Sequence, residues 1–253
     1  MNISHPLVEL IEDRIQIYPK PAVYISGGID SCVLLHHIME KSNEEVYTYT
    51  YAFFEDDNEW PEARQTAEYY GTKHTEILIE PFIARFPEIM HYMDLPRFNL
   101  QSYWLAEKAK KDGREIAYIG EGLDEHFGGY WYKPEKNYIE SWVDHFQFIR
   151  PTHLMIHKIF GIRCELPFTY LPMNETLKYW DPEREKTYLR WAYKEILPEF
   201  VINRRKKPGR PTWRTLWERE FCKIYPHLNP KTDEEIRTLL NRYATAIWLG
   251  VRE

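Results

Sequence analysis

The sequence is poor in the features that mark secreted, membrane-spanning or metal-scaffold proteins. Its 253 residues include three cysteines, at positions 32, 164 and 222, and these form no C-x-x-C pair. Such an odd, scattered set argues against a disulfide framework and a zinc site, and it suits a reducing compartment. The N-terminal stretch MNISHPLVEL lacks the basic start and long apolar run of a signal peptide, and no segment approaches the roughly 18 apolar residues of a membrane span. We therefore expect a cytoplasmic protein without a membrane segment.

An excess of positive charge is also missing. The chain carries 33 Lys and Arg against 39 Asp and Glu, for a formal net charge of −6. This balance argues against a generally basic nucleic-acid-binding protein, but it does not argue against a local basic patch. The hydrophobic fraction of 43% is ordinary for a globular chain that buries a sizeable core.

Strand-like and helix-like segments alternate through the first half of the chain. Short apolar or β-branched runs predict four strands, at 21–25, 45–53, 74–79 and 115–120. Segments with helical periodicity lie beside them, at 5–18, 30–41, 59–71 and 99–113. The alternation predicts an α/β fold in which helices cover both faces of a parallel sheet. Beyond residue 120 the pattern is mainly helical, so we expect a single unit over 1–253, with an α/β core at 20–130 and a helical part at 131–253.

The stretch SGGIDS follows the first predicted strand and opens the next helix. Gly27 and Gly28 allow a tight bend that turns backbone N–H groups toward a ligand, and the following helix N-terminus favours an anion. Ser26 and Ser31 add hydroxyl donors. Asp30 alone would repel phosphate, so we expect it to bind Mg²⁺ that neutralises the phosphates. An ordinary strand–turn–helix corner is the alternative, but the whole pattern favours a phosphate loop, and it differs from a Walker loop because the G-K-[ST] ending is absent.

Two stretches carry a resemblance to a known family. SGGIDS resembles the pyrophosphate loop of the N-type ATP pyrophosphatases, the PP-loop superfamily, which includes asparagine, GMP and NAD synthetases and several tRNA-modifying enzymes. IGEGLDEHFGGY, at 119–130, resembles the S-G-E-G-x-D-E-x-F-G-G-Y segment of the asparagine synthetase family. The resemblance runs from about residue 20 to 215 and implies a parallel sheet of the adenine nucleotide α-hydrolase-like (HUP) type.

The resemblance implies roles for single residues of the second stretch. Gly120 and Gly122 are expected to bind the nucleotide, and Glu121 is expected near the reacting carbonyl. Asp124 is expected to share a magnesium ion with Asp30 across two strand ends. Within this stretch, His126 takes a position that is usually apolar, which favours a packed or surface histidine over a catalytic one.

A later segment, KTYLRWAYKEILPEFVINRRKKPG, resembles the K-x-x-L-R…L-P-x-x-I-x-x-R-x-K element of the family. Its spacing implies that Lys206 contacts the ATP phosphates and the leaving pyrophosphate, where a cation would stabilise growing negative charge. Lys207 is the adjacent alternative, and a solvated basic loop is the structural one. Glu59 falls at a conventional acidic position of the family.

The segment GIRCELPFTY departs from the family pattern G-x-E-x-R-x-P-F-x-D. Arg163 and Glu165 stand in reversed order, and Tyr170 replaces the final aspartate. The reversal is either a structural ion pair or a changed acceptor pocket in which Arg163 and Glu165 contact substrate. The change puts aspartate in doubt as the substrate and leaves the ATP-binding residues untouched.

The resemblance implies an ATP- and Mg²⁺-dependent, AMP-forming amide ligase that adenylates a small-molecule or peptide carboxylate and passes it to ammonia or an amine. Family members commonly carry a glutaminase domain whose cysteine follows the initiator Met; here Asn2 stands there, so we expect ammonia, another amine or a separate glutaminase subunit as the donor. Two alternatives remain. A tRNA- or nucleotide-modifying enzyme could use the basic stretch at 204–214, and a non-catalytic nucleotide-binding protein would also need the loop.

Overall fold

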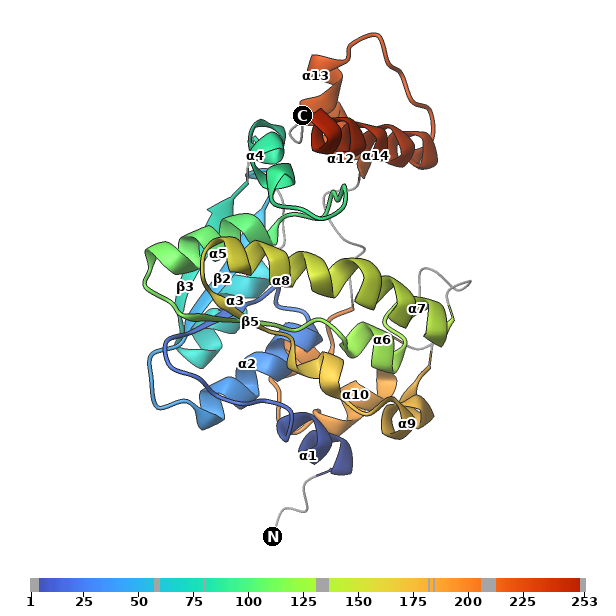
Figure 1. The fold of residues 1–253 in the computed structure, drawn as a ribbon. Coiled ribbons are helices and arrows are strands. Elements are labelled where there is room, and N and C mark those ends of the chain that lie inside the picture. The colour runs from blue at the N-terminus through green and yellow to red at the C-terminus, as the bar shows by residue number, and fades with distance from the viewer. Residues whose placement is uncertain are drawn as a thin grey trace.

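The structure is a computed structural model that describes residues 5–56, 60–79, 81–130, 137–181, 183, 185–205 and 213–250. Its centre is a five-stranded, wholly parallel sheet with the strand order β3-β2-β1-β4-β5 (Figure 1). The strands are β1 Pro21–Tyr24, β2 Tyr47–Ala52, β3 Lys73–Leu78, β4 Ile116–Ile119 and β5 Arg163–Glu165. The four strands predicted from the sequence are confirmed. The fifth was not predicted, because three residues with two charges carry no strand pattern.

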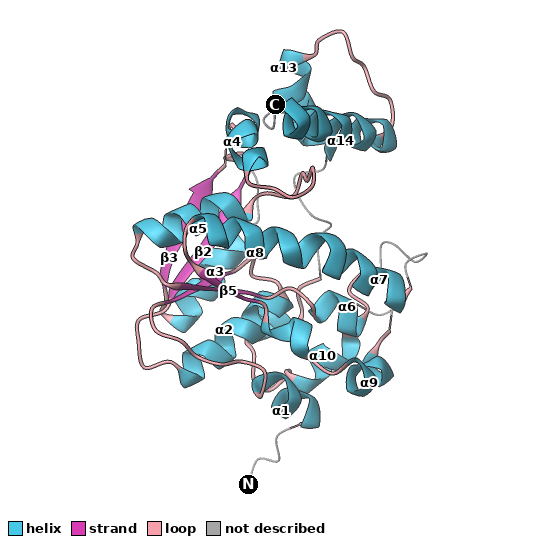
Figure 2. Ribbon diagram, in the orientation of Figure 1, coloured by secondary structure: helices cyan, strands magenta, loops and turns pink. Residues whose placement is uncertain are grey.

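Helices connect and surround the strands (Figure 2). They are α1 Pro6–Glu12, α2 Ile29–Lys41, α3 Trp60–Tyr70, α4 Phe86–His91, α5 Ser102–Lys111, α6 Leu123–Phe127, α7 Tyr138–Asp144, α8 Arg150–Ile159, α9 Met173–Thr176, α10 Thr187–Ala192, α11 Glu199–Ile202, α12 Trp213–Leu216, α13 Cys222–Ile224 and α14 Asp233–Gly250. The part beyond residue 120 is mainly helical, as predicted, apart from β5. Within the described ranges, no helix combines the length and apolar character that crossing a bilayer requires.

The two faces of the sheet bury alternate side chains of the same strands. On β1, Val23 packs into the cluster formed with α2 and α3, whereas Ala22 and Tyr24 pack toward α5. On β4, Ile116 and Ala117 divide in the same way. Because a strand alternates its side chains, short apolar runs such as PAVY are buried on both sides. The result is a rigid, two-faced layer that holds the strand ends in place.

A third apolar cluster joins the C-terminal helices to the sheet-bearing part. It is rich in aromatic rings, including Phe82, Phe86, Phe98 and Phe221, and it also contains Leu240 of α14. Figure 1 shows α14 beside α4, at the end of the molecule opposite the N-terminus. This packing anchors the last described helix, so residues that are far apart in the sequence lie close together.

The strand order puts a reversal between β1 and β4. From β1 the chain proceeds outward through β2 and β3, then returns to place β4 on the other side of β1. Connections leaving neighbouring strands on opposite faces open a crevice beyond their carboxyl ends, which is where ligands bind in sheets of this kind. Both stretches singled out in the sequence follow these two strands.

Candidate active site

A cavity of about 870 Å³ opens beyond the carboxyl ends of β1 and β4. Its lining takes in most of the expected site residues: Ser26, Gly28, Asp30 and Ser31 after β1, and Gly120, Glu121 and Asp124 after β4. A space of this size is large enough for a nucleotide together with a second small substrate. Gly27 and Gly122, which belong to the same two stretches, are buried and do not line the cavity. The structure therefore brings the two predicted stretches together in one place.

Hydrogen bonds within the first loop hold it in a fixed shape. The Ser31 hydroxyl accepts from the Ser26 backbone N–H at 3.2 Å and donates to the Gly28 carbonyl at 3.0 Å. Gly28 is the N-cap of α2, and within the described residues no side chain caps that helix. The first N–H groups of a helix lack intrahelical partners and carry partial positive charge. The loop therefore presents an anion site at the cavity.

Glycine is required at position 27 for steric and conformational reasons. The backbone there has φ +68°, and a Cβ would lie 2.5 Å from the Glu62 carbonyl oxygen and 2.6 Å from the Arg204 guanidinium. Gly120 makes a milder contact, since its Cβ would lie 3.2 Å from the Asp30 carbonyl. The Gly120 contact packs the end of β4 against the first turn of α2, and the Gly27 contact packs the loop after β1 against Glu62 of α3.

A buried lysine connects the two predicted metal ligands. The Lys186 Nζ lies 2.6 Å from Oδ1 of Asp30 and also forms an ion pair with Oδ1 of Asp124. Its side chain is only 3% exposed. No role was assigned to Lys186 from the sequence, although a signal existed, because it is the first residue of the K-T-Y-L-R element.

The donor set fits a hard divalent cation such as Mg²⁺. Asp30 and Asp124 converge on one cation, and carboxylate oxygen is the ligand type that Mg²⁺ prefers. Across the described ranges, no group of three or more His, Cys, Asp or Glu side chains could form a complete metal cage. Two carboxylates suit a metal that takes its other ligands from water and from substrate phosphates. The structure thus brings Asp30 and Asp124 to one cation, the Lys186 ammonium, and the magnesium ion that they are expected to share remains a prediction.

A second wall of the cavity comes from the 185–205 segment. The Arg190 guanidinium donates to the Ile202 carbonyl at 2.6 Å and to the Glu185 carboxylate at 2.8 Å. Arg204 donates to the Ser26 carbonyl at 3.1 Å, so this wall contacts the phosphate loop. Glu185, Arg190 and Arg204 line the cavity with Lys186. The second wall therefore carries more cations than carboxylates.

Three predicted positions, Glu59, Lys206 and Lys207, lie outside the described residues. The roles assigned to them remain predictions. Arg204 and Arg205, which directly precede Lys206, line the cavity.

The structure does not bring Arg163 and Glu165 to the cavity. Arg163 Nε donates to Glu165 at 2.6 Å, its NH2 group donates to the Tyr18 hydroxyl at 2.8 Å, and its side chain is 53% exposed. Both residues lie on β5, an edge strand, and neither lines the cavity. Of the two interpretations drawn from the sequence, this arrangement favours the structural ion pair, because the reversed charges bond to each other and to a surface tyrosine. Tyr170, in place of the family aspartate, accepts from Arg150 at 3.1 Å.

His126 is a packed histidine, as expected. It is fully buried, with Nδ1 2.6 Å from the Thr176 hydroxyl and Nε2 3.1 Å from the Phe168 carbonyl. Burial lowers its pKa to about 4, so the ring is neutral at pH 7. It supports the loop that follows β4 from behind.

Helix α8 adds a histidine to the cavity that sequence reasoning missed. His153 lines the cavity, and its buried Nδ1 has no hydrogen-bond partner among the described residues. Burial is the main cause that lowers its pKa to about 3, and the nearby His157 and His145 contribute to the same shift. One turn on, the His157 Nδ1 lies 2.7 Å from the His153 carbonyl, so its Nε2 accepts from the Tyr24 hydroxyl at 2.9 Å. No sequence pattern marks these histidines, since their relation to β1 is tertiary.

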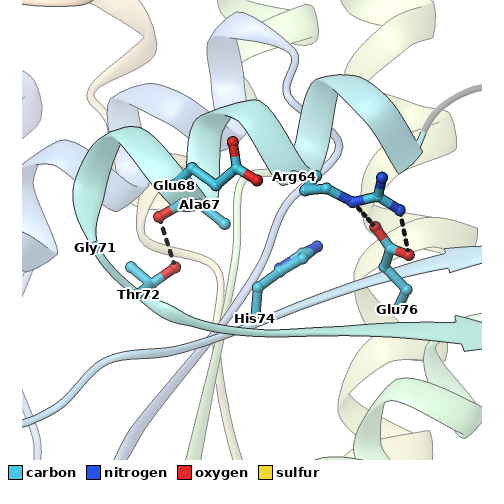
Figure 3. A pocket seen from close by; sticks show the side chains of 7 residues that line it. All are labelled: Arg64, Ala67, Glu68, Gly71, Thr72, His74 and Glu76. Carbon is cyan, nitrogen blue, oxygen red and sulfur yellow. Dashed lines mark hydrogen bonds and ion pairs between the residues drawn. The ribbon is translucent and has the colours of Figure 1, made fainter.

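A smaller hollow of about 330 Å³ lies between α3 and β3 (Figure 3). Arg64 crosses its rim and donates to both carboxylate oxygens of Glu76, at 2.9 and 2.8 Å. None of its lining residues belongs to the larger cavity. It is a surface feature of the sheet edge and contributes nothing to the candidate site.

The part of the chain that contains both site stretches is similar to known proteins. Residues 3–160 match the family model described as asparagine synthase. The amidase chry2 of Gibberella zeae is 30% identical over 51% of this chain and 22% of its own length. A putative glutamine-hydrolyzing asparagine synthetase of Mycobacterium tuberculosis is 29% identical over 49% of this chain and 20% of its own length. The glutamine-hydrolyzing asparagine synthetase of Asparagus officinalis is 25% identical over 84% of this chain and 45% of its own length. The chain thus spans about a fifth of the length of the first two relatives.

Proposed function

Since the chain belongs to the asparagine synthase family, we propose that it is an ATP-dependent, AMP-forming amide ligase. One observation carries the proposal. The glycine loop after β1 and the acidic loop after β4 line one cavity, where Asp30 and Asp124 both pair with the buried ammonium of Lys186. A phosphate loop beside paired carboxylates suits a magnesium–nucleotide substrate. The cations of the 185–205 segment that line the cavity suit a reaction in which negative charge builds on a leaving group.

The chain's own residues would hold the nucleotide at its phosphates. The N-terminus of α2, which no described side chain caps, would bind the anion, and the bonds of Ser26 to Gly28 and of Ser31 to Ser26 shape the loop around it. Asp30 and Asp124 would hold Mg²⁺, which when bound neutralises phosphate charge. Lys206 is proposed to contact the departing pyrophosphate, since the segment that leads to it lines the cavity. Gly120 and Gly122 are proposed to pack against the nucleotide from the β4 side.

The proposed chemistry is two displacements. A substrate carboxylate oxygen attacks the α-phosphorus of ATP, the bond to the β-phosphate oxygen breaks, and pyrophosphate leaves. Ammonia or an amine then attacks the acyl carbon of the adenylate, AMP leaves, and one proton is lost from nitrogen. Glu121, which lines the cavity beside Gly120, is proposed to lie near that carbon. Much of the rate would come from holding the reactants together, because the acyl group is carried on AMP.

The acceptor is proposed to be a small-molecule or peptide carboxylate. Arg163 and Glu165 bond to each other and do not line the cavity, so the choice of acid would rest on other residues. The donor is proposed to be ammonia or an amine on a substrate, with a separate glutaminase subunit as one source of ammonia.

The test is exchange of labelled pyrophosphate into ATP, scanned over small carboxylic acids with aspartate first. We expect exchange that requires Mg²⁺ and one class of acid, because formation of the adenylate is reversible. Exchange with aspartate would identify an asparagine-forming reaction, and exchange with another acid alone would assign the cavity to that acid. Absence of exchange with every acid, while ATP still binds, would contradict the ligase proposal and favour a nucleotide-binding role. Asp13→Asn, at an exposed site on α1's end, is the control for Asp30→Asn, which should abolish exchange.

A further inference from the structure

We infer that Lys186 is an internal counter-ion that keeps magnesium away from the Asp30–Asp124 pair until ATP is bound. The inference rests on the proposed function in one respect, since it takes ATP as the ligand that releases the lysine. It assigns to Lys186 a role in the nucleotide-free protein, and it makes metal and nucleotide enter together.

The first step is the position of the ammonium. Lys186 Nζ lies 2.6 Å from one oxygen of Asp30 and 2.5 Å from the other, and it also pairs with Asp124. The carboxylates are themselves shielded, with side chains 21% and 11% exposed. A divalent ion bound by these same oxygens would need the space that the ammonium fills. Two cations a few ångströms apart in a poorly solvated site repel each other strongly, so one must leave.

The second step is the charge balance without nucleotide. Asp30 and Asp124 would otherwise be two like charges facing each other in a partly buried site, which is unfavourable. One ammonium offsets much of that repulsion and leaves the cluster with one net negative charge. This gives the nucleotide-free protein a stable arrangement that needs no metal.

The third step is what can move. The Lys186 backbone is anchored, because its carbonyl accepts from the Arg190 N–H at 3.0 Å in the first turn of α10. Behind the cluster, a Cβ on Gly129 would lie 2.5 Å from Lys186 Cε and only 1.7 Å from Asp124 Oδ1, so the backbone closes that side. The lysine side chain lines the cavity, so its head group can turn into that space. A long flexible side chain can make that change without altering the fold.

The fourth step is the event that shifts the lysine. ATP brings several negatively charged oxygens to the loop beside Asp30, and an ammonium pairs strongly with phosphate oxygens. Once Lys186 turns to the phosphates, both carboxylates are released to a cation that prefers carboxylate and phosphate oxygens together. Metal and nucleotide binding therefore reinforce each other. Free Mg²⁺ alone has to displace the lysine without offering it a new partner.

The experiment measures uptake of Mn²⁺, a spectroscopic substitute for Mg²⁺, in the absence of nucleotide. Free Mn²⁺ is counted by electron paramagnetic resonance with wild type, Lys186→Met, Lys186→Met/Asp124→Asn and Lys194→Met. Lys194 is an exposed lysine just after α10, so its variant controls for a lost surface charge. We expect wild type and Lys194→Met to take up little Mn²⁺, and Lys186→Met to bind it at least about tenfold more tightly. The double variant should lose that gain.

Two outcomes would overturn the inference: nucleotide-free wild type binding Mn²⁺ as tightly as Lys186→Met, or folded Lys186→Met gaining no affinity. If Lys186→Met does not fold, the melting temperature of the wild-type protein decides. The inference requires Mn²⁺ to raise that temperature only when an uncleavable ATP analogue is present. A wild type that binds the analogue neither with nor without metal would count against the proposed function. The nucleotide-free comparison of Lys186→Met with its double variant would still decide the role of the lysine.

Discussion

The two walls of the cavity are built in different ways. The sheet wall comes from two short contiguous stretches, 26–31 and 120–124, each placed by the strand directly before it. The second wall comes from Lys186, Arg190 and Arg204, which reach the cavity only because the chain returns to it after β5. Local backbone geometry positions the sheet wall, and ion pairs between distant residues position the second wall. We therefore expect added atoms to disrupt the sheet wall, and removal of a charged partner to disrupt the second wall.

The largest effect is expected from breaking the contact between the walls. Asp124→Asn removes one of the two carboxylates that pair with Lys186 and half of the proposed metal site. Pyrophosphate exchange should fall by about 100-fold or more, the scale of losing one charged group at a reacting phosphate. The measurement is the exchange rate at saturating ATP, with Asp13→Asn as control. Parent-like exchange by Asp124→Asn would remove this residue from the site.

A smaller effect, on stability, is expected at the sheet wall. Gly27→Ala places a Cβ at φ +68° and 2.5 Å from the Glu62 carbonyl oxygen. We expect a loss of about 1–3 kcal/mol in the free energy of unfolding from the backbone conformation alone, with the collision adding to it. Gly113→Ala is the matched control, since Gly113 has φ +73° with nothing within 4 Å of its Cβ. Equal losses in urea unfolding would show that Gly27 is not sterically restricted.

The histidines behind the β1 end predict a pH dependence. The pKa of His157 is lowered to about 4 by burial, below the ordinary 6.5 that an unfolded chain has. Between these values the unfolded state binds the proton more readily, so the stability from the neutral ring is complete above about pH 6.5 and is lost as the pH falls toward 4.

His157→Gln should flatten this slope by up to about 1.4 kcal/mol per pH unit, the contribution of one proton. Urea unfolding at several pH values between 4 and 7 gives the slope. The exposed His91→Gln is the control. A slope that is the same in His157→Gln and wild type would mean that other groups cause the acid sensitivity.

The smallest effect is expected outside both walls. Arg163→Ala breaks an exposed ion pair on the edge strand, and such pairs contribute about 0–1 kcal/mol. The KM for the acceptor acid should stay within about twofold of the parent value, since a contact that is absent cannot be lost. A large rise in KM with an unchanged melting temperature would restore Arg163 as a substrate contact.

The features that could be predicted from the sequence are those that local geometry positions, and the features that could not are positioned by contacts between distant residues. Four strands and the two site stretches were predictable, because alternation and contiguous motifs are local signals. Lys186 and Arg190 had a signal in the K-T-Y-L-R element, but no role could be assigned to them, because a charge in a helical segment looks the same whether it faces solvent or a cavity. His153 had no signal, since a buried ring nitrogen with no partner among the described residues becomes visible only once α8 is placed against the sheet. The strand β5 was too short to detect, and its reversed charges suggested a pocket that the fold puts elsewhere.

The most direct test of the central claim identifies the bond of ATP that breaks in the presence of an active acid and an amine. Phosphorus NMR of the reaction mixture separates AMP and pyrophosphate from ADP and phosphate. Cleavage between the α- and β-phosphates, with AMP and pyrophosphate in equal amounts and one amide formed per AMP, is the predicted result. ADP and phosphate as the products, or an intact triphosphate at every acid tested, would contradict it.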